Sequence, residues 1–485
     1  MKLFDLITEK EVLNPAENWG TIEINGVCCD TRTIKTGDAF FALAGAKEDG
    51  AVYAKEAAEK GAACVVAEKP FAEALSVPTV LVHDVRESFA NACFAAVGNP
   101  QKKIKIIGVT GTNGKTTITN VIKKILTDAG KKCAMFTTVG YDVCGAFYPS
   151  SHTTPPPEKL APLFAEACRG GAEYAVMEVS SHAIAQKRVG ALRFEVGIFT
   201  NITRDHLDYH KTMEEYTRVK ASFFALCKNS VINLDDEKAH DIAAGAKENV
   251  CFVSAKKEAD YTIKDIHISP DGMRYTLCGA GKEMPVSLAV AGDFNICNTA
   301  EAAVACLLLG ISEKDICASL VGFGGVAGRM ETVAKNVLPY TVIIDYAHTP
   351  DALIKALEAC RKITRGTLYC VFGCGGNRDR GKRFEMGEIA TRLADVAIIT
   401  SDNPRNEEPE DIIADIVSGV DGGRTNYVTI VSRKEAIEYA LENAKAGDVI
   451  LLAGKGHETY IIDKDGTHYF SEKDVVMNFT ERKEF

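Results

Sequence analysis

The sequence predicts an α/β protein built from three domains. Its 485 residues exceed what a single hydrophobic core usually organises. Apolar runs of strand length alternate with helical patterns over most of the chain, which is typical of mainly parallel sheets flanked by helices. One run continues through a glycine-rich loop into a helix, as phosphate-binding folds do. We expect a small N-terminal α/β domain at 1–98, a central P-loop domain with a mainly parallel sheet and an antiparallel subsheet at 99–330, and a Rossmann-like C-terminal domain at 331–485.

The composition favours a cytoplasmic protein with no nucleic-acid partner. The formal net charge is −10 and the isoelectric point is near 5.6, so a basic surface is not expected. The start, MKLFDLITEK, carries acids where a signal peptide is apolar, and no apolar run is long enough to span a membrane. The 16 cysteines are scattered through apolar patterns without zinc-type spacing, which predicts buried, reduced thiols. We expect a monomer without membrane insertion.

The first 98 residues carry the signals of a small α/β domain. Strand patterns occur at 21–29 and 63–67, and a helical pattern occurs at Tyr53–Lys60. The triplet Asp30-Thr31-Arg32 follows the first strand, and by itself it is more often turn chemistry than a ligand site. Gly98-Asn99-Pro100 is expected to be the linker to the next domain.

The segment Ile104–Ala129 predicts a strand, a phosphate loop and a helix. Gly111 and Gly114 allow backbone N–H groups to close around phosphate oxygens at the positive end of the helix dipole. Lys115 can reach the outer phosphates, and the Thr116 hydroxyl can bind Mg²⁺. The spacing is shorter than in the common loop, so an ordinary glycine turn is the alternative, but the Lys-Thr-Thr run favours phosphate. The expected nucleotide-binding residues are Gly111, Thr112, Asn113, Gly114, Lys115, Thr116 and Thr117.

Polar loops lie near the ends of the following strands. Strands are expected at 133–138, 174–179 and 196–200, and the polar loops are Thr153-Thr154-Pro155, Glu178–His182 and Thr200–His206. In a parallel sheet such loops meet at the carboxyl edge, where ligands bind. Glu178 ends an apolar strand, and a carboxylate there needs a positive partner, such as a Mg²⁺ ion shared with Thr116. The alternative is a helix N-cap arrangement that uses Ser180 and Ser181.

Two further patterns after the third strand have competing interpretations. His206 and His210 are spaced like a zinc pair on a helix, but Leu207 stands where H-E-x-x-H needs its glutamate, so a metalloprotease is not expected. The helical pattern Met213–Cys227 carries Lys220, which the pattern alone assigns to the solvated surface.

The rest of the central domain and its exit are marked by glycines. Short alternating strands at 255–287, with a hairpin turn at Pro270-Asp271-Gly272, predict the antiparallel subsheet. Gly292–Asn295 leads into a helix expected at Asn298–Leu309, and Gly322–Gly328 is expected to be a hinge.

Residues 331–485 form a second alternating series. Strands are expected at 341–345, 367–372, 396–400, 427–431 and 449–453, followed by a hairpin around Asp465-Gly466. Gly376–Lys382 has the common phosphate-loop spacing, but Arg383 follows where Mg²⁺ binding requires Ser or Thr. We therefore expect an anion site for a carboxylate or a phosphate there. Charged residues also follow strands at Asp402–Arg405 and Gly454–Glu458, and this clustering favours function over a passive surface.

These residues resemble the Mur ligases of peptidoglycan synthesis, and within that family the synthetases of the UDP-N-acetylmuramoyl-tripeptide. The resemblance covers nearly the whole chain. It rests on GTNGKTT at 111–117, TTP at 153–155, EVSSHAIAQKRV at 178–189, FTNITRDHLDYHKTMEEY at 199–216, GRME at 328–331, DYAHTPD at 345–351, GCGGNRDRGKR at 373–383, DNPR at 402–405 and AGKGHE at 453–458. Three positions depart from it: Thr31 where relatives usually have D-S-R, Lys211 where glycine is common, and Ala327 where proline is common.

The resemblance implies an ATP-dependent amide ligase with one domain for each of its three substrates. The UDP substrate, UDP-N-acetylmuramoyl-L-alanyl-D-glutamate, would contact Thr31, Arg32, Thr153, Thr154, Ser180, Gln186 and Arg188. Adenosine would contact Asn298, Arg329 and Asp345. Lys220 falls on the carbamylated lysine of the family, which with His206 would hold a second Mg²⁺. The catalytic set implied is Lys115, Glu178, His206 and Lys220, and the metal ligands implied are Thr116, Glu178, His206 and Lys220.

The third substrate is expected to be meso-diaminopimelate, with L-lysine as the alternative. Arg383 and Arg405 would bind the distal carboxylate, while Glu458, Asn403 and the Gly454 carbonyl would bind the distal ammonium. The full expected set is Arg383, Asp402, Asn403, Pro404, Arg405, Gly454 and Glu458. Lysine would leave the arginines unpaired in a closed site.

Two other functions are compatible with parts of this pattern. A related ligase, such as the next Mur enzyme or a folylpolyglutamate synthetase, is disfavoured by DNPR followed by AGKGHE. A nucleotide-switched binding protein would also use a phosphate loop and Mg²⁺, but it would not need Arg383, Arg405 and Glu458 around a second pocket. ATP turnover that requires both other substrates separates these possibilities.

Overall fold

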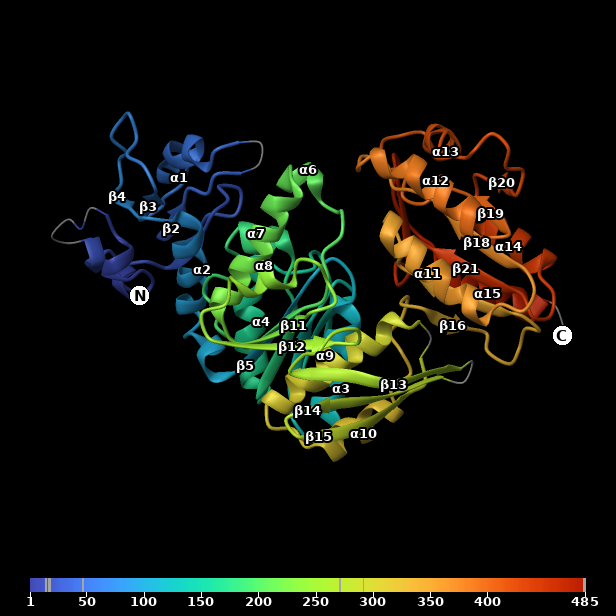
Figure 1. Ribbon diagram of the computed structural model, residues 1–485. Helices are drawn as coiled ribbons and strands as arrows, with labels where there is room; N and C mark the ends of the chain where they lie inside the picture. Colours follow the sequence, from blue (N-terminus) through green and yellow to red (C-terminus); the bar gives the residue numbers. More distant parts are fainter. Residues whose placement is uncertain (14, 16–18, 46–47, 270–271, 291, 483–485) are drawn as a thin grey trace.

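A computed structural model describes residues 1–13, 15, 19–45, 48–269, 272–290 and 292–482. Figure 1 shows three lobes that follow one another along the chain, each with its own sheet. The sheets have four, eleven and six strands, and a separate two-stranded hairpin lies near the C-terminus. The expected mixed α/β class with three sheets is confirmed. Among the described residues, no helix combines the length and the apolar character needed to cross a bilayer.

The N-terminal lobe is a small, fully parallel sheet. Its strands are β1 Gly26–Cys28, β2 Asp38–Phe41, β3 Cys64–Ala67 and β4 Thr79–Leu81, paired in that order, and its helices are α1 Ala54–Glu59 and α2 Val85–Ala96. The strand expected at 63–67 and the helix expected at 53–60 are confirmed. The strand expected at 21–29 is shorter and begins at Gly26. Thr21 ends a 3₁₀ turn, and Glu23 forms only an isolated bridge with Lys2.

The central sheet is parallel in its middle and antiparallel at both edges. Its strands are β5 Lys105–Thr110, β6 Cys133–Phe136, β7 Gly140–Val143, β8 Ala146–Pro149, β9 Tyr174–Glu178, β10 Phe194–Phe199, β11 Cys227–Asn233, β12 Asn249–Ser254, β13 Tyr261–Ser269, β14 Gly272–Gly279 and β15 Lys282–Leu288. Their order is β15-β14-β13-β12-β11-β10-β5-β9-β6-β7-β8. The expected antiparallel subsheet is β13–β15. The turn expected at 270–272 lies partly outside the described residues. The second antiparallel edge, β6–β8, was not predicted.

Helices cover both faces of this sheet. They are α3 Lys115–Asp128, α4 Pro157–Arg169, α5 Ser181–Ala185, α6 Leu207–His210, α7 Met213–Phe223, α8 Ala239–Ala243, α9 Phe294–Leu308 and α10 Glu313–Val321. Helix α3 buries Ile118, Val121, Ile122 and Ile125, a helical spacing that builds one core with β5 and α9. Helix α9 begins four residues earlier than predicted, at Phe294.

The C-terminal sheet is parallel except at one edge. Its strands are β16 Glu331–Val333, β17 Thr341–Asp345, β18 Leu368–Phe372, β19 Val396–Ile399, β20 Tyr427–Thr429 and β21 Val449–Ala453, in the order β16-β17-β21-β18-β19-β20. The helices are α11 Pro350–Ile363, α12 Gly381–Leu393, α13 Pro409–Val417, α14 Arg433–Asn443 and α15 Glu472–Arg482. Helices α11–α13 cover one face and α14–α15 the other (Figure 1). The predicted hairpin is β22 Tyr460–Asp463 with β23 Gly466–Tyr469.

Candidate active site

The phosphate loop joins β5 to α3 at the carboxyl edge of the central sheet. Gly111 and Gly114 have φ of 145° and 90°, in the region that favours glycine. A Cβ at Gly111 would lie 1.9 Å from the Thr200 hydroxyl, and one at Gly114 would lie 2.5 Å from the Asn298 side-chain oxygen. The loop is therefore packed so closely against its neighbours that only glycine fits at either position.

Lys115 and Lys220 approach the same loop from two sides. Lys115 Nζ donates to the carbonyls of Gly111 (2.9 Å) and Thr112 (2.7 Å). Lys220 Nζ, from α7, also donates to Gly111 O at 2.9 Å. Lys220 is 1% exposed, and burial together with nearby Lys115 places its pKa well below the ordinary value. The solvated-surface assignment of Lys220 was wrong, because its helix face packs inward with Tyr216 and against the loop.

Glu178 ends β9 with its carboxylate aimed at the start of α3. It accepts hydrogen bonds from Thr116 Oγ1 (2.9 Å) and from the backbone and hydroxyl of Thr138 (3.0 and 3.1 Å), and it is 1% exposed. The alternative, a helix N-cap that uses Ser180 and Ser181, also occurs in part: the Ser180 hydroxyl accepts from Ala183 N at 3.2 Å as the N-cap of α5. Glu178 and Thr116 thus place two hard oxygen donors side by side, a donor set suited to Mg²⁺.

His206 lies in a cluster of aromatic rings beside the phosphate loop. Its Nε2 is 3.4 Å from Asp205 Oδ2, and its ring centroid is 4.9 Å from that of His182. Partial burial lowers the pKa of His206 and favours the neutral imidazole, while the charge of Asp205 acts in the opposite direction. Across the described residues, no group of three or more His, Cys, Asp and Glu side chains is arranged to hold a metal ion. Lys211 stands at a position where glycine is common in the family that the sequence resembles. Its φ is 60°, a backbone conformation that glycine adopts more easily.

The residues expected to hold the muramoyl-peptide form one hydrogen-bonded group next to Glu178. Thr154 Oγ1 donates to Glu178 O at 2.9 Å, and Ser180 N donates to that hydroxyl at 3.0 Å. Arg188 donates to Thr154 O at 2.9 Å and to Gln186 Oε1 at 2.7 Å. Thr153 Oγ1 accepts from Thr138 at 3.1 Å.

The other two residues expected on the UDP side, Thr31 and Arg32, lie apart in the N-terminal lobe. Arg32 there pairs with Asp30 at 2.6 Å, and 86% of its side chain is exposed. The structure therefore joins five of the seven residues to the central site and leaves two on a separate lobe.

The residues expected around adenosine meet at the border of the central and C-terminal lobes. Asn298 on α9 faces Gly114 of the phosphate loop. The Arg329 guanidinium lies 4.4 Å from the ring centre of Tyr346 and donates to Thr116 Oγ1 at 3.2 Å. Asp345 ends β17 and accepts from Met330 N at 2.8 Å, and burial raises its pKa.

Three loops of the C-terminal sheet face one another. Asn403 Nδ2 donates to Glu458 Oε2 at 2.9 Å, and Arg405 donates to Gly376 O at 2.9 Å. A Cβ at Gly454 would lie 2.9 Å from Asp402 Oδ2. Pro404, in the same loop as Asp402, is buried. The expected amino-acid-binding loops are thus adjacent in space, although the Arg383 side chain points elsewhere.

Arg383 is a correction to the sequence analysis. Its side chain is fully buried, and its guanidinium donates to both oxygens of Glu407 at 2.9 Å and to Asp415 at 2.8 Å. These carboxylates already satisfy the charge, so the structure does not present Arg383 to a ligand. Arg378, five residues earlier in the same motif, is exposed. Burial, and then the charge of Arg378, lower the pKa of Arg405. Arg378 was not among the expected site residues, although it lies in the loop before the helix start at Gly381.

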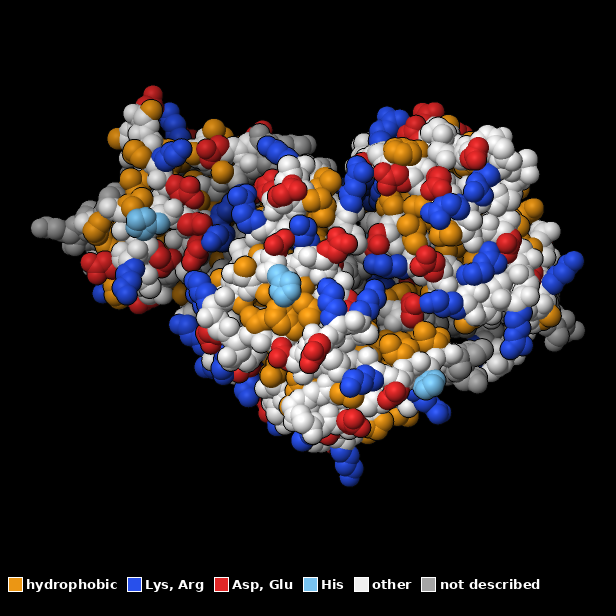
Figure 2. Space-filling view, viewed as in Figure 1, with side chains coloured by type: hydrophobic (Ala, Val, Ile, Leu, Met, Phe, Trp, Pro, Cys, Tyr) orange, Lys and Arg blue, Asp and Glu red, His pale blue; other side chains and the backbone are white. Residues whose placement is uncertain are grey.

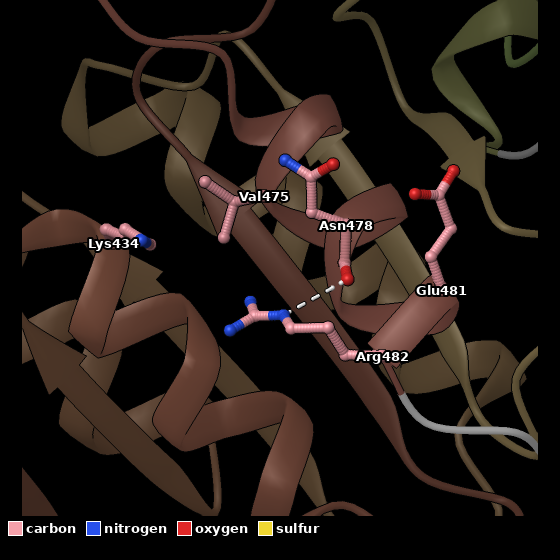
Figure 3. Close-up of a pocket in the computed structure, with 5 residues that line it drawn as sticks. All are labelled: Lys434, Val475, Asn478, Glu481 and Arg482. Atoms are coloured by element: carbon pink, nitrogen blue, oxygen red, sulfur yellow. Dashed lines mark hydrogen bonds between the residues drawn. The ribbon is translucent and has the colours of Figure 1, made fainter.

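The space-filling view shows a notch between the central and C-terminal lobes (Figure 2). Two contacts join these lobes: Asn113 Nδ2 donates to Asp351 Oδ2 at 3.0 Å, and Arg204 pairs with Glu385 at 3.3 Å. A separate shallow pocket lies between α14 and α15 (Figure 3). It is lined by Lys434, Val475, Asn478, Glu481 and Arg482, and no residue expected at the site lines it.

Comparison with known proteins gives matches along the whole chain. Residues 23–105 match the Mur ligase family catalytic domain, 109–306 the Mur ligase middle domain, and 328–456 the Mur ligase glutamate ligase domain. A UDP-N-acetylmuramoyl-L-alanyl-D-glutamate--2,6-diaminopimelate ligase of Clostridium tetani is 42% identical over 489 residues, covering 99% of both chains. A solved structure of a protein with that name is 32% identical, with a TM-score of 0.71 over 100% of this chain and 99% of the other. A MurF ligase of Thermotoga maritima, solved with ADP, shares the fold at 19% identity and a TM-score of 0.61 over 95% of this chain and 98% of the other.

Proposed function

The chain belongs to the Mur ligase family, and from that premise we propose that it joins meso-diaminopimelate to UDP-N-acetylmuramoyl-L-alanyl-D-glutamate at the expense of ATP. It is an acid-amino-acid ligase that forms ADP and extends a peptidoglycan precursor. The observation that carries this proposal is the 42% identity to a relative of that name over 99% of both chains. The geometry supports it, because the phosphate loop, the Glu178 group and the C-terminal loops surround the border between two lobes.

In the first step, the D-glutamate carboxylate attacks the γ-phosphate of ATP, giving an acyl phosphate and ADP. Lys115 lies over the phosphate loop, where its charge offsets that of the transferring group. The N–H groups at the start of α3 add to this effect through the helix dipole. Thr154, Ser180 and Arg188 sit beside Glu178, a position suited to holding the muramoyl-peptide close to that transfer.

Mg²⁺ fits the oxygen donors of Thr116 and Glu178, which we assign as its ligands. When bound, the ion offsets the negative charge of the phosphate oxygens during transfer. A second position, with His206 and Lys220, fits only if Lys220 is carbamylated, because an ammonium has no lone pair for a metal. The buried Lys220 amine has a pKa well below the ordinary value, so it can be neutral and able to add CO₂.

In the second step, the amine of diaminopimelate attacks the acyl carbon and inorganic phosphate leaves. The amine reaches this carbon from the C-terminal lobe, so the two lobes must come together around the acyl phosphate and exclude water. We assign residues 1–98 to the UDP end, 99–330 to ATP and 331–485 to the incoming amino acid. Free thiols on all sixteen cysteines and the use of ATP support a cytoplasmic location.

Specificity for diaminopimelate is assigned to the loops of the C-terminal sheet. Arg405 with Arg378 is proposed to bind the distal carboxylate, and Arg378 replaces Arg383 in this role. Glu458, Asn403 and the Gly454 carbonyl are proposed to bind the distal ammonium, with Asp402 adjacent. Lysine lacks the distal carboxylate and would leave both arginines without a carboxylate to pair with.

The test is ADP formation with each substrate omitted in turn, combined with mass spectrometry of the product. We expect turnover only when the UDP-muramoyl-dipeptide and meso-diaminopimelate are both present, and a product heavier by one diaminopimelyl residue. Equal kcat/KM for L-lysine would contradict the assigned specificity. ATP hydrolysis that needs neither substrate would contradict the ligase itself and favour a nucleotide-switched binding protein.

A further inference from the structure

Lys455 is a buried cation in the AGKGHE motif to which no role has yet been given. It follows β21, and its side chain is fully buried. Its Nζ donates to Asp402 Oδ1 (3.3 Å), Asn403 Oδ1 (3.2 Å) and Glu458 Oε2 (3.5 Å). Three residues proposed to bind the incoming amino acid therefore share one ammonium group.

These contacts tie together two loops that are far apart in sequence. Asp402 and Asn403 follow β19, whereas Glu458 follows β21, and Asn403 also accepts from Ile462 N of the closing hairpin at 3.0 Å. The side chains of Asp402 and Glu458 are only 9% and 13% exposed. Two carboxylates with so little solvent repel each other unless a cation lies between them.

The charges of this cluster match a zwitterionic head better than a lone ammonium. Lys455 offsets one of the two carboxylates, so the cluster retains one negative charge for a substrate ammonium. The neighbouring buried pair Arg433 and Glu472, 2.8 Å apart, is neutral as a whole and adds no net charge to the cluster. Arg405 and Arg378 remain available for a substrate carboxylate. Without Lys455 the cluster would carry two negative charges, which favours a cationic side chain and opposes a carboxylate nearby.

We propose that Lys455 is a positioning residue that sets specificity for the distal amino-acid head of the substrate. It holds Asp402, Asn403 and Glu458 in one arrangement and limits their net charge to a single negative. This inference rests on the proposed function and adds to it a residue that touches no substrate atom.

The test compares kcat/KM for meso-diaminopimelate and L-lysine in wild type and in Lys455→Gln, which keeps hydrogen-bond donors but removes the charge. We expect the preference for diaminopimelate to fall about tenfold or more, mainly through KM. The acyl phosphate, trapped with hydroxylamine in the absence of the amino acid, should form at the wild-type rate, because the phosphate loop is untouched. Lys464→Gln, at an exposed lysine of the same hairpin that pairs with Glu408, is the matched control and should leave the preference unchanged.

Two further variants, Asp402→Asn and the double variant Lys455→Gln with Asp402→Asn, keep the test decisive if Lys455→Gln alone does not fold. Asp402→Asn leaves a neutral cluster and should weaken diaminopimelate relative to 2-aminopimelate, which lacks the distal ammonium. Lys455→Gln combined with Asp402→Asn restores one negative charge and should restore that preference. A folded Lys455→Gln with the wild-type ratio, or a double variant no better than Asp402→Asn, overturns the proposal. Wild-type enzyme that does not use diaminopimelate would instead overturn the proposed function.

Discussion

Burial decides what the charged side chains near the phosphate loop can do. Lys115 and Lys220 both donate to Gly111 O, so two amines share one small region. Repulsion and burial favour the neutral form of Lys220, and a neutral amine can react with CO₂. A signal for this burial exists in the sequence, because Tyr216, Lys220 and Phe223 fall on one helical face. Polarity alone assigned Lys220 to solvent, since a single sequence does not say what covers a helix.

We expect Lys220→Ala to lose most ligase activity, and bicarbonate with short-chain carboxylic acids to restore part of it. A small carboxylate can enter the space of the missing carbamate. Mass spectrometry of the intact wild type should show the added CO₂. A plain ammonium in an active, Mg²⁺-bound enzyme would contradict the prediction.

Substitution of Arg378 should affect substrate binding, whereas substitution of Arg383 should affect the stability of the fold. Arg378→Ala is expected to raise KM for diaminopimelate about tenfold or more with the melting temperature unchanged, because its exposed guanidinium makes no hydrogen bond or ion pair with the described residues. Arg383→Ala is expected to cost about 2 to 3 kcal/mol of unfolding free energy, because it leaves Glu407 and Asp415 without their buried partner. Kinetics and urea denaturation of both variants measure the two effects. The reverse pattern would return the substrate role to Arg383.

His348 should make stability depend on pH in the acid range. Burial, and then the charge of Lys382, lower its pKa from the ordinary 6.5 to about 4, and its Nδ1 donates to Tyr346 O at 2.7 Å. Between these pH values the His348 imidazole is protonated in the unfolded chain but stays neutral in the folded chain. The free energy of unfolding therefore falls as the pH drops from about 6.5 towards 4. His348→Gln should show a shallower loss of unfolding midpoint from pH 7 to pH 5. Parallel curves for the two proteins would contradict this. A slope should remain in the variant, because the pKa values of His457 and His206 are lowered as well.

At the scale of elements, hydrophobic runs determined what could be predicted. The strands β17, β18, β19 and β21 lie within one residue of their expected bounds, because each is a continuous buried run between turn residues. The edge strands β8 and β16 were missed, because partly exposed strands lack such a run. Strand β7, between β6 and β8, was missed because its four residues are too few to form one. The start of α9 at Phe294 was missed although Asp293, a residue type that is common at N-caps, precedes it. The Asp293 side chain makes no capping hydrogen bond.

Close packing of the phosphate loop predicts the effect of one methyl group. Gly114→Ala should place Cβ 2.5 Å from the Asn298 oxygen in a backbone with φ of 90°, and should weaken ATP binding by at least about tenfold through displacement of the loop. Gly130→Ala is the control, because Gly130 has φ of 74° just after the same helix but nothing within 4 Å of the added Cβ. It should cost about 1 kcal/mol of stability and leave ATP affinity unchanged, as measured by calorimetry.

At the scale of the molecule, the site is assembled by contacts between distant parts of the chain. Asn113 and Asp351 are 238 residues apart, and Arg204 and Glu385 are 181 apart. No local pattern indicates which side chains meet over such separations, so the sequence pointed to the loops but not to their pairings. The same limit explains why Arg383 was wrongly expected to bind a substrate carboxylate. Its partners Glu407 and Asp415 lie on a different loop and helix.

The Arg204–Glu385 pair should help to hold the two lobes together during the reaction. Its side chains are 63% and 30% exposed, so the pair is worth only about 1 kcal/mol or less, and the effect should be modest. We expect Arg204→Glu and Glu385→Arg each to raise the ADP released per ligated product about two- to fivefold, because looser closure lets water hydrolyse the acyl phosphate. The double variant restores opposite charges and should return the ratio towards wild type, which a double-mutant cycle of ADP and product yields measures. If the two single effects simply add in the double variant, the pair does not couple the lobes, and closure depends on other contacts such as Asn113 with Asp351.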